Sequence, residues 1–282
     1  MAEGDTIYRT AERLRPIVGE TIVAARAQPG PGLRRVPDLS RLVGARVTSV
    51  ESRGKQLLIG FDNGLTMRSH LRMTGSWHLH RRGERWRRPV RQATAIVETD
   101  RFVAVAFNTP VIELLTDDGL RRSRPLVTLG PDLLSPVFDA DEALRRLRER
   151  DGVELAAALL DQRAVAGIGN VYKSELAFLE GFDPWAPVSA FDDAELRRAL
   201  EMARRLLAAN AHGGRRTTTG RRAPGEGLWV YGRAGRSCRR CGSVILSRRQ
   251  GEGARTTYWC PSCQPARSLV ADGHVIRHHG QS

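Results

Sequence analysis

The stretch CRRCGSVILSRRQGEGARTTYWCPSC, residues 238–263, holds every cysteine of the chain. These cysteines form two Cys-x2-Cys pairs: Cys238, Cys241, Cys260 and Cys263. The pairs are separated by 18 residues, a spacing typical of a four-cysteine zinc site. Because four protein thiolates leave no open position for water, the pattern predicts one structural Zn²⁺ per chain, held in a ribbon over 229–264. The alternatives are a redox dithiol or unrelated cysteines.

Upstream of the ribbon, the segment 138–228 has the periodicity of several helices. Asp139 and Glu142 make a plausible capping pair for the helix that follows them. Further helical patterns cover 153–161, 171–181 and 192–210, and Gly181 and Pro184 separate the last two. The sequence therefore predicts an all-helical domain in this part of the chain.

Two glycines lie between the second and third of these helices, in the stretch Ala166-Gly167-Ile168-Gly169-Asn170. Glycine allows a sharp turn in which backbone N–H groups approach a phosphate, and Asn170 could add a side-chain donor. Taken alone, a turn with Gly and Asn is usually only a connection between helices.

The first 120 residues have a different pattern, with one leading helix and many short strands. Ile7, Ala11, Leu14 and Val18 fall on one helical face, with Asp5 or Thr6 as the expected N-cap. The strand-like runs cover residues 21–27, 45–52, 55–61, 65–71, 93–99 and 101–107. Such a series predicts a β-sandwich or barrel.

One of these strand pairs is a clear hairpin. Asn63-Gly64 joins the runs 55–61 and 65–71, and this dipeptide accepts the positive φ angles of a type I′ turn. The fold class is thus α+β and multidomain: a β-sandwich domain over 2–120, a linker over 121–137, the helical domain and the ribbon. The segment 265–282 has little to pack and is expected to be a disordered tail.

The charge of the chain points to a polyanionic partner. Lys and Arg total 45 against 31 Asp and Glu, which gives a formal net charge of +14. The arginines are clustered, with six in 81–91 and four each in 214–222 and 233–241. The alternative is a set of solvated loops in a protein with arginine-rich codon usage. No apolar run is long enough for a membrane span and the N-terminus has no secretory pattern, so we expect a cytoplasmic protein without a membrane partner.

Five motifs carry a resemblance to a known family: AEGDT at the N-terminus, SRGKQLLI at 52–59, HLRMTGSW at 70–77, LDQRAVAGIGNVYKSE at 160–175 and ARTTYWCPSCQ at 254–264. In this order and spacing the chain resembles the formamidopyrimidine-DNA glycosylase / endonuclease VIII family, and more closely its actinobacterial endonuclease VIII branch. The resemblance implies a leading helix and β-sandwich, a helix–two-turns–helix domain and a zinc ribbon. It also implies a bifunctional DNA glycosylase / AP lyase of base excision repair, associated with the nucleoid in the bacterial cytoplasm.

The resemblance implies three catalytic residues. Ala2, exposed once Met1 is removed, would supply its α-amine as nucleophile at C1′ of the damaged nucleotide, because an α-amine is partly neutral near physiological pH. Glu3 would be a general acid on the deoxyribose ring oxygen, and Lys55 would contact the lesion-side phosphate. Taken alone, Glu3 is equally an acid of a helix first turn and Lys55 an exposed strand lysine.

This chain departs from the family pattern at the nucleophile, where the family has proline and this sequence has Ala2. The secondary amine of proline gives a permanently cationic iminium, whereas the primary amine of alanine gives an imine that must gain a proton. The departure predicts weakened lyase activity, and loss of activity is the alternative.

The family's DNA contacts fall on four further residues. Asn170 and Arg255 match residues that grip phosphates beside the lesion. Met73 matches a residue that wedges into the base stack when the nucleotide is flipped out, with Arg72 beside it. A buried core methionine is the alternative for Met73. In the formamidopyrimidine branch an Arg and a Phe from another loop also fill the space left by the flipped nucleotide. Here Arg101-Phe102 has the pattern of an ordinary hairpin turn. This difference and the run VIELL at 111–115 favour oxidised pyrimidines over oxidised purines as substrates.

Three functions follow from these observations. The first is a glycosylase/AP lyase acting, as a monomer, on damaged double-stranded DNA by β- and δ-elimination. The second is a relative that binds damage or abasic sites but has lost its chemistry, as Ala2 would permit. The third is a zinc-ribbon protein that binds RNA or ribosomes, against which the N-terminal AEGDT motif argues.

Overall fold

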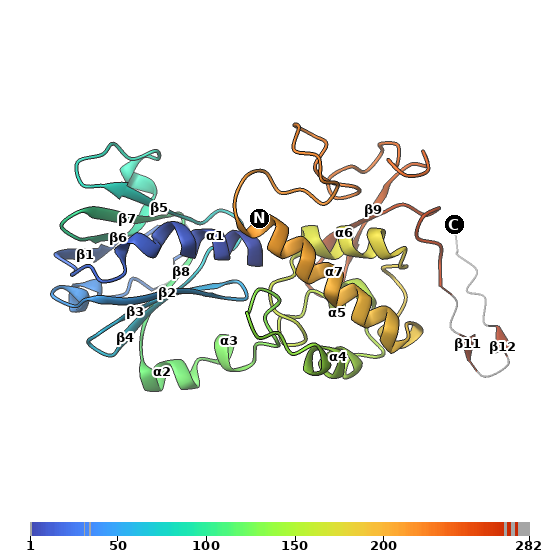
Figure 1. Cartoon of the computed structure of the whole chain (residues 1–282), viewed down its shortest axis with the longest axis horizontal. Coiled ribbons are helices and arrows are strands. Elements are labelled where there is room, and N and C mark those ends of the chain that lie inside the picture. The colour runs from blue at the N-terminus through green and yellow to red at the C-terminus, as the bar shows by residue number, and fades with distance from the viewer. Residues whose placement is uncertain (1, 31, 34, 268–269, 272–273, 276–282) are drawn as a thin grey trace. The chain divides into compact units, whose positions relative to one another are not determined.

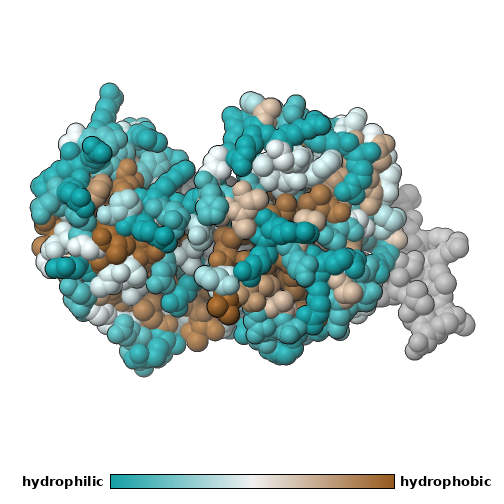
Figure 2. All heavy atoms as spheres, viewed as in Figure 1, coloured by the Kyte–Doolittle hydropathy of each residue, from teal (hydrophilic) through white to brown (hydrophobic). Residues whose placement is uncertain are grey.

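The computed structural model describes residues 2–30, 32–33, 35–267, 270–271 and 274–275. The chain forms two compact units, Met1–Thr128 and Leu129–Ser282, and each is described by itself. Hydrophilic residues cover much of the face of the molecule drawn in Figure 2. No helix in the described ranges is long and apolar enough to cross a membrane.

The first unit is a sandwich of two four-stranded antiparallel sheets with one leading helix (Figure 1). Helix α1 spans Gly4–Leu14. One sheet has the order β1-β6-β7-β5, with bounds Ala24–Ala27, Ala93–Glu98, Phe102–Phe107 and Ser76–Arg81. The other has the order β2-β3-β4-β8, with bounds Val47–Arg53, Gln56–Phe61, Leu65–His70 and Val111–Thr116. The unit also contains three short 3-10 turns, Arg15–Ile17, Leu39–Leu42 and Val90–Gln92, and at its end the short helices α2, Asp117–Arg122, and α3, Arg124–Val127.

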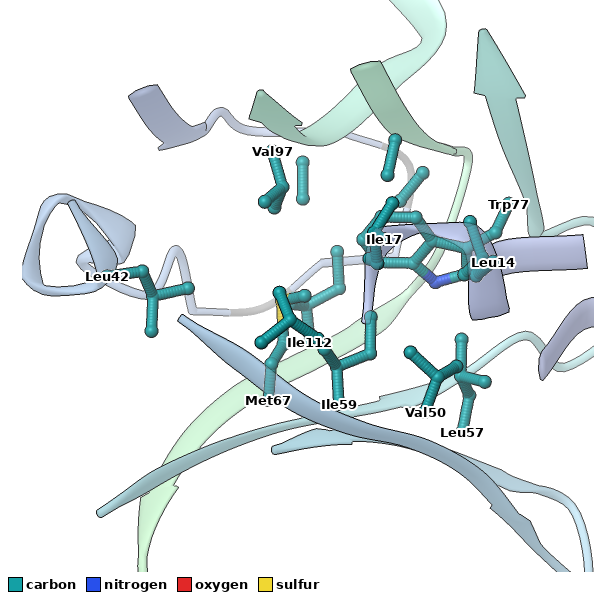
Figure 3. Packing of buried hydrophobic residues seen from close by; sticks show 14 of the residues in the cluster. Leu14, Ile17, Leu42, Val50, Leu57, Ile59, Met67, Trp77, Val97 and Ile112 are labelled. Carbon is teal, nitrogen blue, oxygen red and sulfur yellow. The ribbon is translucent and has the colours of Figure 1, made fainter. Parts of the chain in front are cut away.

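The core of this unit lies between the two sheets and against α1 (Figure 3). Leu14 of α1 packs with Trp77 of β5 and with Ile59 of β3, all of them buried. Alternation along each strand sends one set of side chains inward. The predicted sandwich with a leading helix is therefore confirmed. The strands β5 and β8 were not among the strand-like runs predicted from the sequence.

Two local details differ from the sequence prediction. The N-cap of α1 is Glu3, not Asp5 or Thr6, and both of those residues lie inside the helix. The β3–β4 hairpin is present, but Asn63 is absent from the positive-φ residues and only Gly64 has a positive φ, of 75°. The type I′ prediction is wrong, because the strands end at Phe61 and Leu65 and leave a three-residue loop, which takes a single left-handed glycine.

Helices dominate the first part of the second unit. Their bounds are α4 Ala140–Arg148, α5 Leu155–Ala158, α6 Asn170–Glu180, a 3-10 turn at Val188–Ala190 and α7 Asp193–Ala211. Asp139 caps α4, since its carboxylate accepts from the backbone N–H of Glu142 at 2.9 Å, as predicted. Gly181 ends α6 in the left-handed conformation. The predicted linker, 121–137, begins inside helix α2, Asp117–Arg122, and contains the whole of helix α3, Arg124–Val127.

The cysteine-rich part forms a hairpin of β9, Leu246–Gln250, and β10, Arg255–Trp259. Most of the expected tail lies outside the described residues, apart from its start and the short strands β11 Val270–Ala271 and β12 His274–Val275. At its start the expectation of little packing is wrong. The Arg267 guanidinium donates to both carboxylate oxygens of Glu195 at 2.9 and 3.0 Å, and it lies over the ring of Phe191.

Candidate functional site

The N-terminal end of the first unit contacts the loop between β4 and β5. The backbone nitrogen of Ala2 donates to the carbonyl oxygen of Arg72 at 3.3 Å, and Ala2 packs half-buried against the sandwich core. The loop is tight, because the N–H of Gly75 donates to the carbonyl of Leu71 at 2.9 Å. A Cβ at Gly75 would lie 2.6 Å from that same carbonyl oxygen, so only glycine fits here.

The conformation of this loop depends on Arg72 and His70. Arg72 has a φ of 48°, in the left-handed region that non-glycine residues rarely adopt. Its backbone N–H donates to Nδ1 of His70 at 3.1 Å, which holds the residue in that conformation. Met73 follows, with 53% of its surface exposed, so it is not a core methionine.

Glu3 directly follows Ala2 and is fully buried. As the N-cap of α1 it adopts an extended backbone, and its carbonyl accepts from the N–H groups of Thr6 and Ile7 at 2.9 and 3.1 Å. The helix start therefore fixes the position of Glu3 beside the N-terminal nitrogen. Two of the predicted catalytic residues, Ala2 and Glu3, are thus held by α1 and the Arg72 loop together.

Lys55 lies in the turn between β2 and β3, directly after Gly54, whose φ is 54°. Its charge reaches His70: burial, then the positive charges of Lys55 and Arg72, lower the pKa of His70 to about 4. His70 is therefore neutral near pH 7, which is the form whose Nδ1 can accept the hydrogen bond from Arg72. This histidine joins Lys55 to the Arg72 loop, and it was quoted in the HLRMTGSW motif without a role.

The lowered pKa of His70 predicts a pH-dependent stability. The unfolded chain, with an ordinary histidine pKa of about 6.5, binds this proton at a pH where the folded chain does not, so stability falls as the pH drops from about 6.5 towards 4. We expect this residue to account for a loss of about 2 kcal/mol in unfolding free energy between pH 7 and pH 5. His70→Asn keeps an acceptor for Arg72 and removes the titration, so urea unfolding of this variant should show that much less pH dependence. An unchanged pH dependence in this variant would show that the loss arises at other groups.

In the second unit, Asn170 is the first residue of α6 and is 95% buried, with 5% of its surface exposed. Its Nδ2 donates to the carbonyl of Thr256 at 2.9 Å, and within the described part of the chain its buried Oδ1 has no hydrogen-bond partner. Thr256 is the neighbour of Arg255 at the start of β10. The structure therefore brings the two predicted phosphate-binding residues of this unit to one place, where the glycine turn meets the ribbon hairpin.

Helix α6 carries buried charges that attach the ribbon to the helical domain. Nζ of Lys173, fully buried, donates to Oγ1 of Thr257 at 2.7 Å. The hydroxyl of Thr257 in turn donates to Oε1 of Gln250 at 2.5 Å, and Nε2 of Gln250 reaches Oε2 of Glu154 at 2.9 Å. This chain of hydrogen bonds fixes the β9–β10 hairpin against α6.

Glu175, two residues after Lys173 on α6, holds the segment of chain that enters the ribbon. Its carboxylate accepts from the backbone N–H groups of Trp229, Val230 and Tyr231, each at 2.8 Å, and from the hydroxyl of Thr218. Burial raises the pKa of this carboxyl, and the same hydrogen bonds oppose the rise. Lys173 and Glu175 lie in the motif LDQRAVAGIGNVYKSE, and the sequence patterns gave neither of them a role. The sequence feature that could have pointed to them is a pair of charges in a helix that is mostly buried.

The four cysteines form one cluster: Cys238, Cys241, Cys260 and Cys263. All four sulfur atoms lie within 4.8 Å of one another, with Sγ pairs at 3.9 Å and 3.4 Å. A tetrahedral zinc with Zn–S bonds of about 2.3 Å needs sulfur–sulfur separations of about 3.8 Å. The donor set and its spacing therefore fit a four-thiolate metal site.

Comparison with known proteins places this chain in a family. Residues 1–110 match the family described as Formamidopyrimidine-DNA glycosylase N-terminal domain, and residues 129–221 match the Formamidopyrimidine-DNA glycosylase H2TH domain. The chain belongs to the formamidopyrimidine-DNA glycosylase family. The resemblance predicted from the sequence motifs, and with it the helix–two-turns–helix architecture, is confirmed.

The relatives support the endonuclease VIII branch. The chain is 43% identical to Probable endonuclease 8 2 of Streptomyces coelicolor, over 94% of both chains. It is 41% identical to DNA-(apurinic or apyrimidinic site) lyase Nei2 of Mycolicibacterium smegmatis, over 94% of this chain and 100% of the relative. A Lactococcus lactis Fpg, solved in complex with DNA containing N7-benzyl-Fapy-dG, has the same fold, with a TM-score of 0.77 at 22% identity over 94% of this chain and 100% of that one.

Proposed function

We propose that this protein is a DNA glycosylase with AP lyase activity that acts in base excision repair, as a monomer, on damaged duplex DNA in the bacterial cytoplasm. The observation that carries the proposal is the contact between the Ala2 nitrogen and the Arg72 carbonyl, 3.3 Å apart. This contact groups the N-terminal residue, buried Glu3 and the exposed Met73 loop. Family membership and the net charge of +14 support the choice of DNA as substrate.

In the proposed reaction the α-amine of Ala2, free after removal of Met1, attacks C1′ of the damaged nucleotide. The glycosidic bond breaks, and the base leaves with the bonding electrons and takes up a proton from the attacking nitrogen. Glu3 protonates the deoxyribose ring oxygen as the base leaves, the bond from C1′ to the ring oxygen breaks, and the nitrogen–C1′ bond becomes a protonated imine. Proton loss from C2′ then expels the 3′ phosphate by β-elimination, and a second elimination releases the 5′ phosphate.

The remaining residues bind DNA in this proposal. Lys55 contacts a phosphate beside the lesion, and Asn170 and Arg255 contact the backbone from the second unit. Met73, exposed at its loop tip, enters the base stack with Arg72 beside it. Arg101, in the turn between β6 and β7, donates from Nε to the carboxylate of Glu20 at 3.0 Å. This bond supports leaving Arg101 and Phe102 out of the lesion site, and their absence from it favours oxidised pyrimidines as substrates.

We further propose that the metal held by the four cysteines is zinc in a structural role. Four thiolates fill the coordination sphere of Zn²⁺ and leave no position for a reacting water. The backbone N–H of Arg240 donates to Sγ of Cys238 at 3.4 Å, and such a hydrogen bond stabilises a thiolate. The zinc supplies no chemistry to the reaction and holds the ribbon hairpin that carries Arg255.

Borohydride trapping on duplex DNA with one abasic site tests the imine step, after intact-mass measurement has shown that Met1 is absent. We expect a covalent adduct that maps to Ala2. A relative that binds damage without catalysis is the second candidate, favoured by Ala2 in place of the family proline. Tight binding of the abasic site without any adduct would support that candidate instead.

Ala2→Pro separates the chemistry of the nucleophile from the rest of the site. Proline forms a permanently cationic iminium, so we expect strand cleavage at an abasic site to rise by about tenfold, equal to about 1.4 kcal/mol of barrier. Single-turnover cleavage at saturating protein measures the change. Ala2→Gly, which keeps a primary amine, is the control and should not give the increase. An inert proline variant would place the defect elsewhere in the pocket.

A further inference from the structure

The sandwich carries a second concentration of positive charge away from the Ala2 site. It is the distal arginine surface, made of six residues of the segment between β5 and β6: Arg81, Arg82, Arg85, Arg87, Arg88 and Arg91. All are exposed except half-buried Arg88. This segment lies at the upper left of Figure 1, and the same region of Figure 2 is mostly hydrophilic. None of the roles proposed above uses it.

The segment is anchored on the outer face of the β1-β6-β7-β5 sheet. Trp86 packs on a small apolar cluster there, which includes Ile96, Val105 and Phe107. Its ring meets that of Phe107 edge-on, with centroids 6.0 Å apart, and stacks on the buried ring of His80 at 6.4 Å. An arginine-rich loop without such an anchor is a solvated surface, whereas this one is held in place by an aromatic side chain.

The charges of the surface are largely left without carboxylate partners. Within the described residues, Arg85, Arg87 and Arg91 take part in no ion pair, and Arg82 reaches Asp100 only at 3.9 Å. Exposed arginines elsewhere do pair, as three examples show: Arg26 with Glu98 at 2.7 Å, Arg145 with Glu142 at 2.7 Å and Arg197 with Asp141 at 2.5 Å. Burial first, and then the charge of Arg88, lower the pKa of His78 on the same sheet face, as expected beside unneutralised cations.

The surface is also far from the Arg72 loop. Strand β5, Ser76–Arg81, begins directly after Gly75 of that loop and ends at the first arginine of the surface. Five residue steps along a strand span about 17 Å, and this length separates the surface from the Met73 loop.

Resting on the proposed function, we propose that the distal arginine surface binds the phosphate backbone of duplex DNA outside the segment engaged at the Ala2 site. Arginine forks bind phosphate oxygens in pairs and suit a polyanionic backbone. Proteins that bind single-stranded DNA stack its bases on exposed aromatic rings, whereas the ring of Trp86 packs against the sheet. The DNA bound here is a distant part of the lesion-bearing duplex or a second duplex, and both have the same chemistry.

The triple variant Arg85→Gln, Arg87→Gln, Arg91→Gln tests this proposal. We expect its affinity for an undamaged duplex of about 40 base pairs to fall about tenfold near 0.1 M salt, and the slope of log affinity against log salt to shrink by 2 to 3, since each lost phosphate contact contributes about 0.9. Single-turnover cleavage of a short abasic duplex at saturating protein should stay within twofold. Stoichiometry with two differently labelled long duplexes distinguishes the sources, because only binding of a second duplex gives a ternary complex that the triple variant loses.

A charge-matched control keeps the test independent of net charge. Arg26→Gln, Arg145→Gln, Arg197→Gln removes the same charge from exposed arginines that are paired with carboxylates. We expect this control to keep more of the salt slope than the test variant. Equal slopes in the two variants would overturn the proposal. Failure of cleavage in the unsubstituted protein would count against the proposed function and leave the binding comparison intact.

Discussion

Removing the bound metal is expected to unfold the ribbon and, with it, to abolish tight binding of DNA. The apolar cluster around the cysteines is small, with Phe178, Val230 and Ile245 as its other buried members. Structural zinc in comparable sites contributes about 10–16 kcal/mol, more than so few apolar side chains supply. We therefore expect residues 229–264 to lose their ordered structure when a chelator extracts the metal.

Hydrogen exchange read by mass spectrometry follows this loss directly. Peptides from β9 and β10 should lose protection in metal-free protein, while peptides from the sandwich core keep theirs. Loss of β10 also removes the contacts of Thr256 with Asn170 and of Thr257 with Lys173, so affinity for an abasic duplex should drop at least about a hundredfold. Cys260→Ser should behave as the chelated protein does, and Ser262→Ala, in the same knuckle, should not. Full protection and binding without metal would show that the ribbon is held by its packing alone.

Glu3→Gln is expected to reduce release of a damaged base by 10²–10⁴-fold, the range typical of a removed general acid. Glutamine has nearly the same shape as glutamate and cannot give a proton. The N-cap position makes no side-chain hydrogen bond to the helix, so α1 should remain intact. A preformed abasic site is partly an open-chain aldehyde, which forms the imine without a proton on the ring oxygen, so borohydride trapping there should be reduced far less than base release.

Single-turnover kinetics on two substrates, one with an oxidised pyrimidine and one with an abasic site, measures both effects. Glu12→Gln, on the same helix, is the matched control. Glu12 is half-exposed, and its carboxylate pairs with Arg15 at 2.6 Å. Its removal should change neither rate by more than about twofold, because such surface ion pairs contribute little. If base release by Glu3→Gln were unchanged, the proton would come from another group and the proposed role of Glu3 would be wrong.

Much of the fold could be predicted because its signals are local. The β3–β4 hairpin follows from two strand-like runs joined by Asn63-Gly64, and the cap of α4 follows from Asp139 three residues before Glu142. The helix–two-turns–helix segment and the cysteine ribbon were likewise expected. Errors arose where neighbouring solutions are nearly equal in energy, as with the N-cap at Glu3 and the one-glycine turn at Gly64.

The candidate site could be predicted only in part. The residue types came from motifs, but the roles of His70, Lys173 and Glu175 depend on partners far away in the chain. Lys173 bonds with Thr257, 84 residues later, and Glu175 with the backbone at 229–231. No spacing rule signals such a pair, because the partners meet only after the hairpin has packed on α6.

The sequence alone determined the metal-ligand set, the principal helices and strands, and the excess of positive charge, since each depends on residue type and short-range spacing. Tertiary structure decided which sheet each strand joins and that the Ala2 nitrogen meets the Arg72 carbonyl. It also decided that Trp86 fixes the arginine segment on an outer sheet face. The physical reason is that packing, burial and long-range hydrogen bonds are non-local: they depend on which surfaces the folded chain brings together.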